Sequence, residues 1–512
     1  MAIDAETNQK LPLNRRAALR AIALGAAGVT LAACGGATTP AAAPTAAPAA
    51  AAATAAPAAE AATAAPAAAG ATAAPAEAAP TAAPAESAPT AAAGEPTPEP
   101  TPVVNALGSG AKTVVFWHGL GGADGATMQE MLKSYAAAKG DRTVRSETYD
   151  WNVFYQKLPT SIVAKSPPNL AIMHSWAIQQ FAAQGLLQPA DDIFFSTGLV
   201  PKDDFNPTLI DAITIDGKTQ AVPFDNHGWI NWVNTKVIKD AGLDPEKPPK
   251  NGTEFIEWAQ KITVDEAGKH PNEDGFNPDK VKIWATHSSW QRFTLPSTIW
   301  QFGGGIFEGK KSLLNDPKTI AAVQYWYDLI FKYRVVPPAT PGVPSPPNLF
   351  KTNSIAYMWD GTWSLNFFKD NPDSAAVMKP MPLNSLAPDG KQAVRFDSHL
   401  LVIPTGVEGE ALEDAKDLIK WLSDNGETWA TSGQVPARLS VQQKPSVQEI
   451  PSGKTASAEF KEFGRPGQTH PDINEIVTIY EAAFSASLAG TTPVDQAMND
   501  AHTQVQAILD RS

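Results

Sequence analysis

The chain has 512 residues, 43% of them hydrophobic, and carries a formal net charge of −13 at pH 7. Such an acidic chain argues against nucleic acid or an anionic lipid surface as the main partner, and the sequence contains no basic stripe. A single cysteine cannot form an internal disulfide or a cysteine-based zinc site.

The N-terminus has the order of an export signal. Arg15 and Arg16 precede an uncharged run, 21–33, that is rich in Ala, Leu, Ile and Gly. These 13 residues are too few for a lasting membrane span, which takes about 20. The paired arginines resemble a twin-arginine signal, and residues 31–34 (LAAC) resemble a bacterial lipobox. We therefore predict a signal peptide over 1–33 and lipidation of Cys34.

The next segment predicts a tether. Residues 34–110 are almost wholly Ala, Pro, Thr and Gly, with no aromatic residue and no Lys or Arg. Such a segment cannot bury enough apolar surface to offset its ordering entropy. We expect a disordered linker over 34–110.

The composition changes at Lys112, and strands then alternate with helices. The expected elements are a strand at 112–117, a helix at 126–138, a strand at 143–149, a helix at 152–165, a strand at 169–174 and a helix at 178–184. This order predicts an α/β fold with a parallel sheet. Ligands of such sheets lie beyond the carboxyl ends of the strands, which selects the loop 118–125 and the turn 174–176.

Further along, residues 219–234 predict two short strands around residues 225–228, followed by a helix at 236–241. Here the sequence resembles family 1 extracellular solute-binding proteins of ABC importers, the group of maltose- and glycerol-phosphate-binding proteins. The motifs are, in order, N234-T-K with A241-G-L-D-P and T253–T263, S354-I-A-Y-M-W-D-G-T-W, F396-D-S-H-L-L-V-I-P and G433-Q-V-P-A-R.

The resemblance implies a two-lobed, periplasmic-binding-protein-like fold. Each lobe is then a mixed sheet flanked by helices, with the ligand cleft at the hinge. We expect the chain to cross between lobes near 222–225, 343–348 and 395–399. One lobe would hold 112–222 and 349–396, and the other 223–348 and 397–512. Closure of the lobes around a ligand is a hinge motion.

A sugar presents hydroxyl groups at its rim and C–H groups on its faces, so its receptor needs aromatic platforms and hydrogen-bonding side chains. Asp225, Asn226 and His227 at the hinge are the strongest candidates. We assign Trp232, Trp258, Trp326 and Trp421 to the core. The full set of candidate ligand-binding residues is Trp117, His118, Asp124, His174, Trp176, Asp225, Asn226, His227, Trp229, Trp290, Trp300, Trp359, Asp360, Trp363, Asp397, His399 and Arg438.

Other ligands remain open. A phosphorylated polyol would call on Arg292, Arg395 and Arg438. Five histidines fall in predicted cleft-side loops: His118, His174, His227, His287 and His399. If they converge, they would permit a metal or an anionic ligand. No two of them have helical i, i+4 spacing and no HExxH occurs, so we predict neither a metal site nor a cofactor.

Catalysis has little support in the sequence. There is no GxSxG elbow, and the glycine-rich loop GLGGADG lacks the Lys-Ser/Thr ending of a nucleotide-binding loop. A glycosidase could place two carboxylates, such as Asp225 and Asp360, in a sugar cleft. We expect no catalytic residues. The resemblance implies a monomer that is tethered by lipid to the outer face of the bacterial cytoplasmic membrane, at the cell surface or in the periplasm. It implies an ABC permease with a cytoplasmic ATPase as partners.

Overall fold

The folded region begins earlier than the sequence predicts. The computed structural model describes residues 101–338 and 342–511, so the expected signal peptide, Cys34 and most of the linker lie outside the described residues. Strand β1 (Val103–Gly108) pairs antiparallel with β3 (Arg142–Thr148) along its whole length. The expected linker end at residue 110 is therefore wrong, because backbone hydrogen bonds to a sheet edge order a segment that buries little apolar surface.

The first sheet contains the predicted parallel strands. Strands β2 (Lys112–His118) and β4 (Leu170–His174) run parallel to one another and β2 also runs parallel to β3. The helices that follow the three strands are α2 (Ala123–Lys139), α3 (Trp151–Val163) and α4 (Ile178–Ala183). All six predicted elements are confirmed, and each bound lies within three residues of the prediction.

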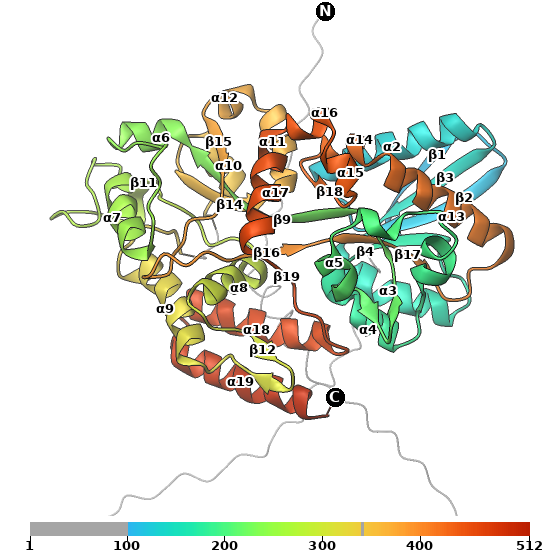
Figure 1. Ribbon diagram of the computed structural model, residues 1–512. Coiled ribbons are helices and arrows are strands. Elements are labelled where there is room, and N and C mark those ends of the chain that lie inside the picture. Colours follow the sequence, from blue (N-terminus) through green and yellow to red (C-terminus); the bar gives the residue numbers. More distant parts are fainter. Residues whose placement is uncertain (1–100, 339–341, 512) are drawn as a thin grey trace, which may run out of the picture. The chain divides into compact units, whose positions relative to one another are not determined.

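Later segments complete this sheet, which defines the first lobe. Its order is β1-β3-β2-β4-β17-β5, and β8 pairs with β17 as well. The added strands are β5 (Leu187–Gln188), β8 (Val222–Pro223) and β17 (His399–Pro404). Strand β17 runs antiparallel to β4, so the sheet is mixed. In Figure 1 this sheet lies on the right, with its blue strands beside α2 and α13.

The second sheet, which defines the second lobe, is built around β9 (Asp225–Asn234), whose ten residues are all buried. Strands β14 (Tyr357–Gly361) and β16 (Val394–Asp397) pair antiparallel with β9. Strand β19 (Gly464–Pro466) runs parallel to β16, and β15 (Met378–Met381) and β18 (Val435–Pro436) also pair with β9. This sheet is mixed too, as expected.

The remaining strands form three small two-stranded sheets: β6 (Thr214–Ile215) with β7 (Lys218–Thr219), β10 (Val264–Asp265) with β11 (Val281–Ile283), and β12 (Phe307–Glu308) with β13 (Lys311–Ser312).

Helices cover both sheets, and α18 and α19 pack side by side in the second lobe (Figure 1). The helices not yet named are α5 (Pro207–Ala212), α6 (Thr235–Asp240), α7 (Gly252–Ile262), α8 (Gln291–Gln301), α9 (Pro317–Phe331), α10 (Pro346–Lys351), α11 (Leu365–Lys369), α12 (Pro372–Ala375), α13 (Gly409–Asp424), α14 (Gly426–Ala430), α15 (Leu439–Gln442), α16 (Pro445–Gln448), α17 (Pro451–Phe463), α18 (Ile473–Leu488) and α19 (Val494–Arg511). Helix α6 confirms the helix predicted at 236–241. No helix in the described part of the chain is both long and apolar enough to span a bilayer.

The expected division of the lobes needs correction. Residues 349–396 were expected beside 112–222, but β14, β15 and β16 all pair with β9 of the second sheet. Conversely, β17 and α13 were expected in the second lobe, yet β17 pairs with β4 and α13 packs against it. No change of sheet occurs at 343–348. Antiparallel pairing between distant segments carries no local sequence pattern, which is why the resemblance alone misplaced them.

Two of the three expected crossings are confirmed in position. The chain passes from β8 to β9 through Phe224, and from β16 to β17 through Ser398. A further passage follows α14, which packs against α2, and leads into β18 on β9. The predicted strand pair around residues 225–228 is instead β8 and the start of β9.

One buried carboxylate connects these passages. Asp225 Oδ1 accepts hydrogen bonds from the backbone N–H of His399 at 3.0 Å and from His227 Nδ1 at 2.9 Å. Its Oδ2 accepts from His399 Nδ1 at 2.7 Å and from Trp429 Nε1 at 2.7 Å. Burial by itself raises the pKa of Asp225. The His399 and His227 rings lower this pKa by more than burial raises it, so the pKa ends well below its ordinary value. Asp225 therefore joins β9, β17 and α14 as an ionised group.

Replacing Asp225 should weaken the whole fold. In the Asp225→Asn variant the buried donors on three segments face a neutral side chain that has one acceptor oxygen instead of two. We expect this variant to lose about 3 kcal/mol of unfolding free energy. Urea unfolding at pH 7 measures this loss. The matched control is Asp240→Asn, which removes an exposed ion pair with Lys236 and should cost less than about 1 kcal/mol. Equal losses in the two variants would contradict the role given to Asp225.

A second buried acid predicts a pH dependence. Burial raises the pKa of Glu459 on α17 from its ordinary 4.5 to about 8. Between those pH values the folded state holds a proton that the unfolded chain has released, so this group makes stability fall as the pH rises from about 4.5 to about 8. Glu459→Gln mimics the protonated acid. It should match the wild type near pH 5 and exceed its unfolding free energy at pH 9 by about 2 kcal/mol or more.

Urea melts at the two pH values test this expectation. Glu462→Gln changes an exposed acid on the same helix and serves as the control, with no pH-dependent gain expected. If the unfolding free energy of Glu459→Gln differs from that of the wild type by the same amount at both pH values, Glu459 is ionised at both, which would contradict the expectation.

Candidate ligand site between the two lobes

Aromatic and imidazole rings from both sheets form a continuous layer where the lobes meet. The Trp151 and His174 ring centroids lie 4.2 Å apart, and His174 lies 5.0 Å from His399. His399 stacks on His227 at 4.1 Å, and His227 leads to Trp363 at 6.1 Å. The ring layer, as we call it, consists of Trp151, Tyr155, His174, Trp176, His227, Trp229, Phe293, Trp363 and His399.

Strand ends place these rings. His174 closes β4 and Trp151 begins α3 just after β3, so both lie at the carboxyl ends of parallel strands, as the sequence predicts for a ligand edge. Two glycines make room for tryptophan rings. A Cβ on Gly119 would lie 2.1 Å from the Trp151 ring, and one on Gly361 would lie 2.2 Å from the Trp363 ring. Each tryptophan therefore lies flat against bare backbone.

The histidines differ in charge because their neighbours differ. Burial, followed by the charges on His399 and His227, lowers the pKa of His174 well below its ordinary value. Burial also lowers the pKa of His399, but the Asp225 carboxylate raises it more, and the net shift is upward. At neutral pH His174 is therefore uncharged, while ionised Asp225 shifts His399 toward its protonated form.

Several indole N–H groups at this layer lack partners. The Nε1 atoms of Trp117, Trp176 and Trp229 are buried and have no hydrogen-bond partner among the described residues. Trp117 packs against Tyr149 at 4.9 Å, and Trp229 stacks on Phe293 at 5.0 Å. A buried donor without a partner is unfavourable by about 1–3 kcal/mol, so a polar guest that accepts from it gains that energy on binding.

Trp290 is the one large aromatic residue with mostly exposed surface in the described chain, at 52%. Its backbone has φ of +52°, a left-handed conformation that is strained for a bulky residue and that occurs often at binding sites. Its ring meets Trp363 edge to face at 6.2 Å. Beside it, burial raises the pKa of Asp360 to about 6. Hydrogen bonds from Gly361, Ser364 and Trp290 lower this pKa, but by less than burial raises it.

Polar contacts also bridge the lobes. Gln434 Nε2 donates to Asp124 Oδ2 at 3.2 Å, while Gln434 Oε1 accepts from Thr362 at 2.6 Å, so α2 of the first lobe is joined to the second. At the Ser398 crossing, Arg395 Nε donates to Asp397 Oδ2 at 3.0 Å. The guanidinium of Arg395 also lies over the Phe293 ring at 4.6 Å. The Gln434 contacts join the two lobes, whereas those of Arg395 lie within the second lobe.

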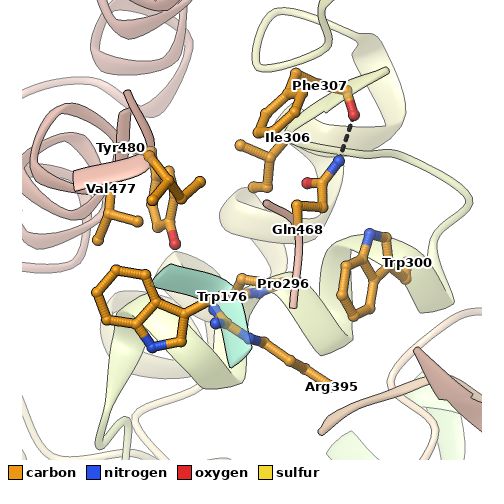
Figure 2. Close-up of a pocket in the computed structure, with 10 residues that line it drawn as sticks. Trp176, Pro296, Trp300, Ile306, Phe307, Arg395, Gln468, Val477 and Tyr480 are labelled. Atoms are coloured by element: carbon orange, nitrogen blue, oxygen red, sulfur yellow. Dashed lines mark hydrogen bonds between the residues drawn. The ribbon is translucent and has the colours of Figure 1, made fainter. Parts of the chain in front are cut away.

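Two hollows adjoin this region. Figure 2 shows Trp176, Arg395 and Tyr480 around a small cavity, with Gln468 donating to the Phe307 carbonyl at its rim. It has about 10 Å³ of free space, enough for one water molecule at most. A larger groove of about 570 Å³ is lined by Asn226, Phe396 and Leu439 among others.

The larger groove lies on the opposite face of the second sheet. Side chains alternate along a strand, so Asn226 and Phe396 point away from the face that carries His227 and Asp397. We take the ring layer as the candidate site, despite its closed packing, because it alone combines the parallel-strand ends with partnerless donors.

Not all predicted residues join the ring layer. Asn226 faces the groove, Trp300 lines the small cavity, and Trp359 packs on Trp326 at 5.5 Å in the core, where its Nε1 is also without a partner. Arg438 pairs with Asp204 and Asp424. His118 bonds Ser146 at 2.8 Å, and burial followed by the charge on His399 lowers its pKa to about 3.

Sequence reasoning missed four residues, which are Trp151, Tyr155, Phe293 and Trp429. Trp151 and Tyr155 were placed in no site, although they follow the end of β3 and the carboxyl-end rule that selected His118 and His174 also selects that turn. Trp429, which donates to Asp225, lies in α14 and had no signal in the sequence. The convergence of His174, His227 and His399 was left open, because their spacing along the chain does not reveal it.

Solved structures share this fold. The chain superposes on maltose-bound MalE3 of T. maritima with a TM-score of 0.66 at 20% identity, covering 78% of this chain and all of the other. It superposes on the Thermus thermophilus maltotriose-binding protein, bound with maltotriose, with a TM-score of 0.63 at 18% identity, covering 77% and 100%. These likenesses establish the two-lobed periplasmic-binding-protein-like fold.

Curated relatives match over a shorter stretch. The sn-glycerol-3-phosphate-binding periplasmic protein UgpB of Shigella dysenteriae is 27% identical over 157 residues, which is 29% of this chain and 35% of the relative. The chain thus spans about a third of the length of the curated relatives that it matches. The family described as bacterial extracellular solute-binding protein matches residues 130–455. That match covers more than half of the chain, which therefore belongs to the bacterial extracellular solute-binding protein family.

Proposed function

We propose that this protein captures a neutral sugar or oligosaccharide between its two lobes and delivers it to an ABC-type permease. The observation that supports this most is the ring layer together with the buried, partnerless indole donors of Trp117, Trp176 and Trp229. Flat rings suit the C–H faces of a sugar, and indole N–H groups suit its hydroxyl oxygens. A neutral guest also suits a layer in which the Asp225 carboxylate already accepts hydrogen bonds from His227 and His399.

Contacts from both lobes would make the guest stabilise the closed arrangement. Trp151 and His174 belong to the first lobe, and Trp229 and Trp363 to the second. A ligand that touches both sets binds the closed form better than the open form, and so shifts the population toward it. The sugars bound by the structural neighbours, maltose and maltotriose, are of the same chemical class.

The remaining parts of the proposal come from the family and from the N-terminal sequence. An extracellular binding protein of an importer works outside the cytoplasmic membrane with a permease and a cytoplasmic ATPase, and we expect it to act as a monomer. Lipid on Cys34 would tether it at the cell surface or in the periplasm.

A phosphorylated polyol is the second candidate, because the curated relatives are named for glycerol phosphate. Its phosphate would need a free arginine. Arg395 is committed to Asp397, and Arg438 to Asp204 and Asp424, which leaves Arg292, whose nearest acid is Glu481 at 3.7 Å. The engaged guanidinium groups favour the neutral sugar.

Enzymatic turnover is not part of the proposal. Asp225 and Asp360 are the two acids that a glycosidase reading would use. Asp225 already accepts four hydrogen bonds, so it has no free lone pair directed at a substrate. Incubation with a bound oligosaccharide followed by chromatography should return the sugar intact.

Trp290 offers the sharpest test of the sugar site. Purified full-length chain should bind at least one of maltose, maltotriose and mannotriose in calorimetry, with sn-glycerol-3-phosphate as the comparison ligand. Trp290→Ala removes an exposed platform together with its edge-to-face contact to Trp363 and its hydrogen bond to Asp360. It should weaken sugar affinity about tenfold, the equivalent of about 1.4 kcal/mol, and circular dichroism should show that the variant is folded.

Leu439→Ala is the matched control, because Leu439 is also exposed but lines the groove on the far face of β9. It should leave affinity unchanged. The reverse pattern, with Leu439→Ala alone weakening the sugar, would move the site to that groove. Binding of glycerol phosphate without any sugar would replace the carbohydrate proposal with the second candidate.

A further inference from the structure

Three histidines from separate strands converge inside the ring layer. His174 ends β4, His227 is the third residue of β9, and His399 begins β17. One ring nitrogen of each lies within 4.8 Å of those of the other two. Among the described residues no other group of three or more histidine, cysteine or acidic side chains gathers in this way. Three imidazoles around one point are a usual ligand set for zinc.

The second ring nitrogen of each histidine is already held. His227 Nδ1 and His399 Nδ1 bond to the two oxygens of Asp225, at 2.9 Å and 2.7 Å. His174 Nδ1 bonds the Tyr155 hydroxyl at 2.8 Å. Histidines that bind a metal almost always have their other nitrogen fixed by a carboxylate or another polar group, which sets the tautomer and the ring orientation. The Nε2 atoms are therefore the ones offered to a ligand.

We propose that His174, His227 and His399 bind one divalent transition-metal ion, with Zn²⁺ as the best match, through their Nε2 atoms. Asp225 and Tyr155 act as positioning residues for the three rings. Three histidines leave a fourth tetrahedral position for water or for an oxygen of a guest. This assigns an inorganic ligand that the sugar-binding proposal does not require, and each proposal can fail alone.

The distances and charges at the cluster fit this assignment. Zinc–nitrogen bonds of about 2.0–2.1 Å imply ligand nitrogens roughly 3.3 Å apart, so the nitrogens, now within 4.8 Å of one another, must approach more closely, and the stacked His227 and His399 rings must turn to direct their lone pairs at one ion. The ion would lie beside ionised Asp225, with Asp124 and Asp397 close enough to act on His399.

The position of the cluster adds a consequence. His174 and His399 lie on the first sheet and His227 on the second. An ion held by all three joins the lobes directly beside the Phe224 and Ser398 crossings. Bound metal would then favour the closed arrangement of the lobes, as a guest in the ring layer would.

Cobalt titration of the full chain tests the proposal. The protein is prepared without a histidine tag, stripped with chelator and titrated with Co²⁺, whose visible absorption becomes intense in four-coordinate sites. We expect one Co²⁺ per chain with that absorption and its displacement by one equivalent of Zn²⁺. His227→Gln and, from the other lobe, His174→Gln should each weaken binding by at least about 100-fold.

Two further variants sharpen the result. His270→Gln changes a histidine outside the cluster, bonded to the Thr263 carbonyl, and should bind Co²⁺ as the wild type does. Tyr155→Phe removes only the hydroxyl that holds His174 and should weaken Co²⁺ binding about 10- to 100-fold, with an altered absorption spectrum. Circular dichroism identifies any variant that fails to fold. If either His227→Gln or His174→Gln does not fold, Co²⁺ binding by the other variant tests the metal site.

Absence of saturable Co²⁺ and Zn²⁺ binding would overturn the metal site, as would binding that both folded ligand variants retain. Sugar titrations are run on the chelator-treated protein and again with Zn²⁺. Sugar binding without metal binding refutes the metal site and leaves the proposed function intact. Metal binding without any sugar binding refutes the proposed function and leaves the metal site intact.

Discussion

The buried Asp225 carboxylate is the interaction on which the rest of the structure depends. It lies at the first residue of β9, and it accepts from the backbone that opens β17 and from the indole of α14. A charge removed from water is stable only when donors surround it, and here those donors come from the three segments that pass between the lobes. The same contacts orient His227 and His399. The fold and the candidate site thus share one electrostatic anchor.

Around this anchor the structure combines two requirements that usually conflict. The rings of the layer are packed against one another, yet buried indole donors without partners and three converging imidazoles lie among them. Bare backbone at Gly119 and Gly361 lets large rings lie close to the strands that carry the histidines. A guest that replaces water there finds apolar faces and unfilled polar groups together. This combination suits a receptor that closes on its ligand.

The family resemblance supplied the positions of the crossings near Phe224 and Ser398, and local patterns in the sequence predicted the parallel part of the first sheet. They did so because apolar runs, helix periodicity and turn residues act over short distances. The partners of β14, β15 and β16 could not be predicted in this way, since antiparallel pairing with β9 depends on contacts far along the chain. Trp359 and Arg438 were misjudged for a related reason, as core packing and ion pairing with Asp204 are visible only in three dimensions.

The central claim is that a sugar binds in the ring layer while both lobes close upon it. Hydrogen–deuterium exchange of the full chain, with and without the tightest-binding saccharide, measures this directly. The account predicts slower exchange in the first lobe at 118–124 and 149–152 and in the second lobe at 289–293 and 361–364. Protection confined to 439–461, beside the groove on the far face of β9, would contradict it.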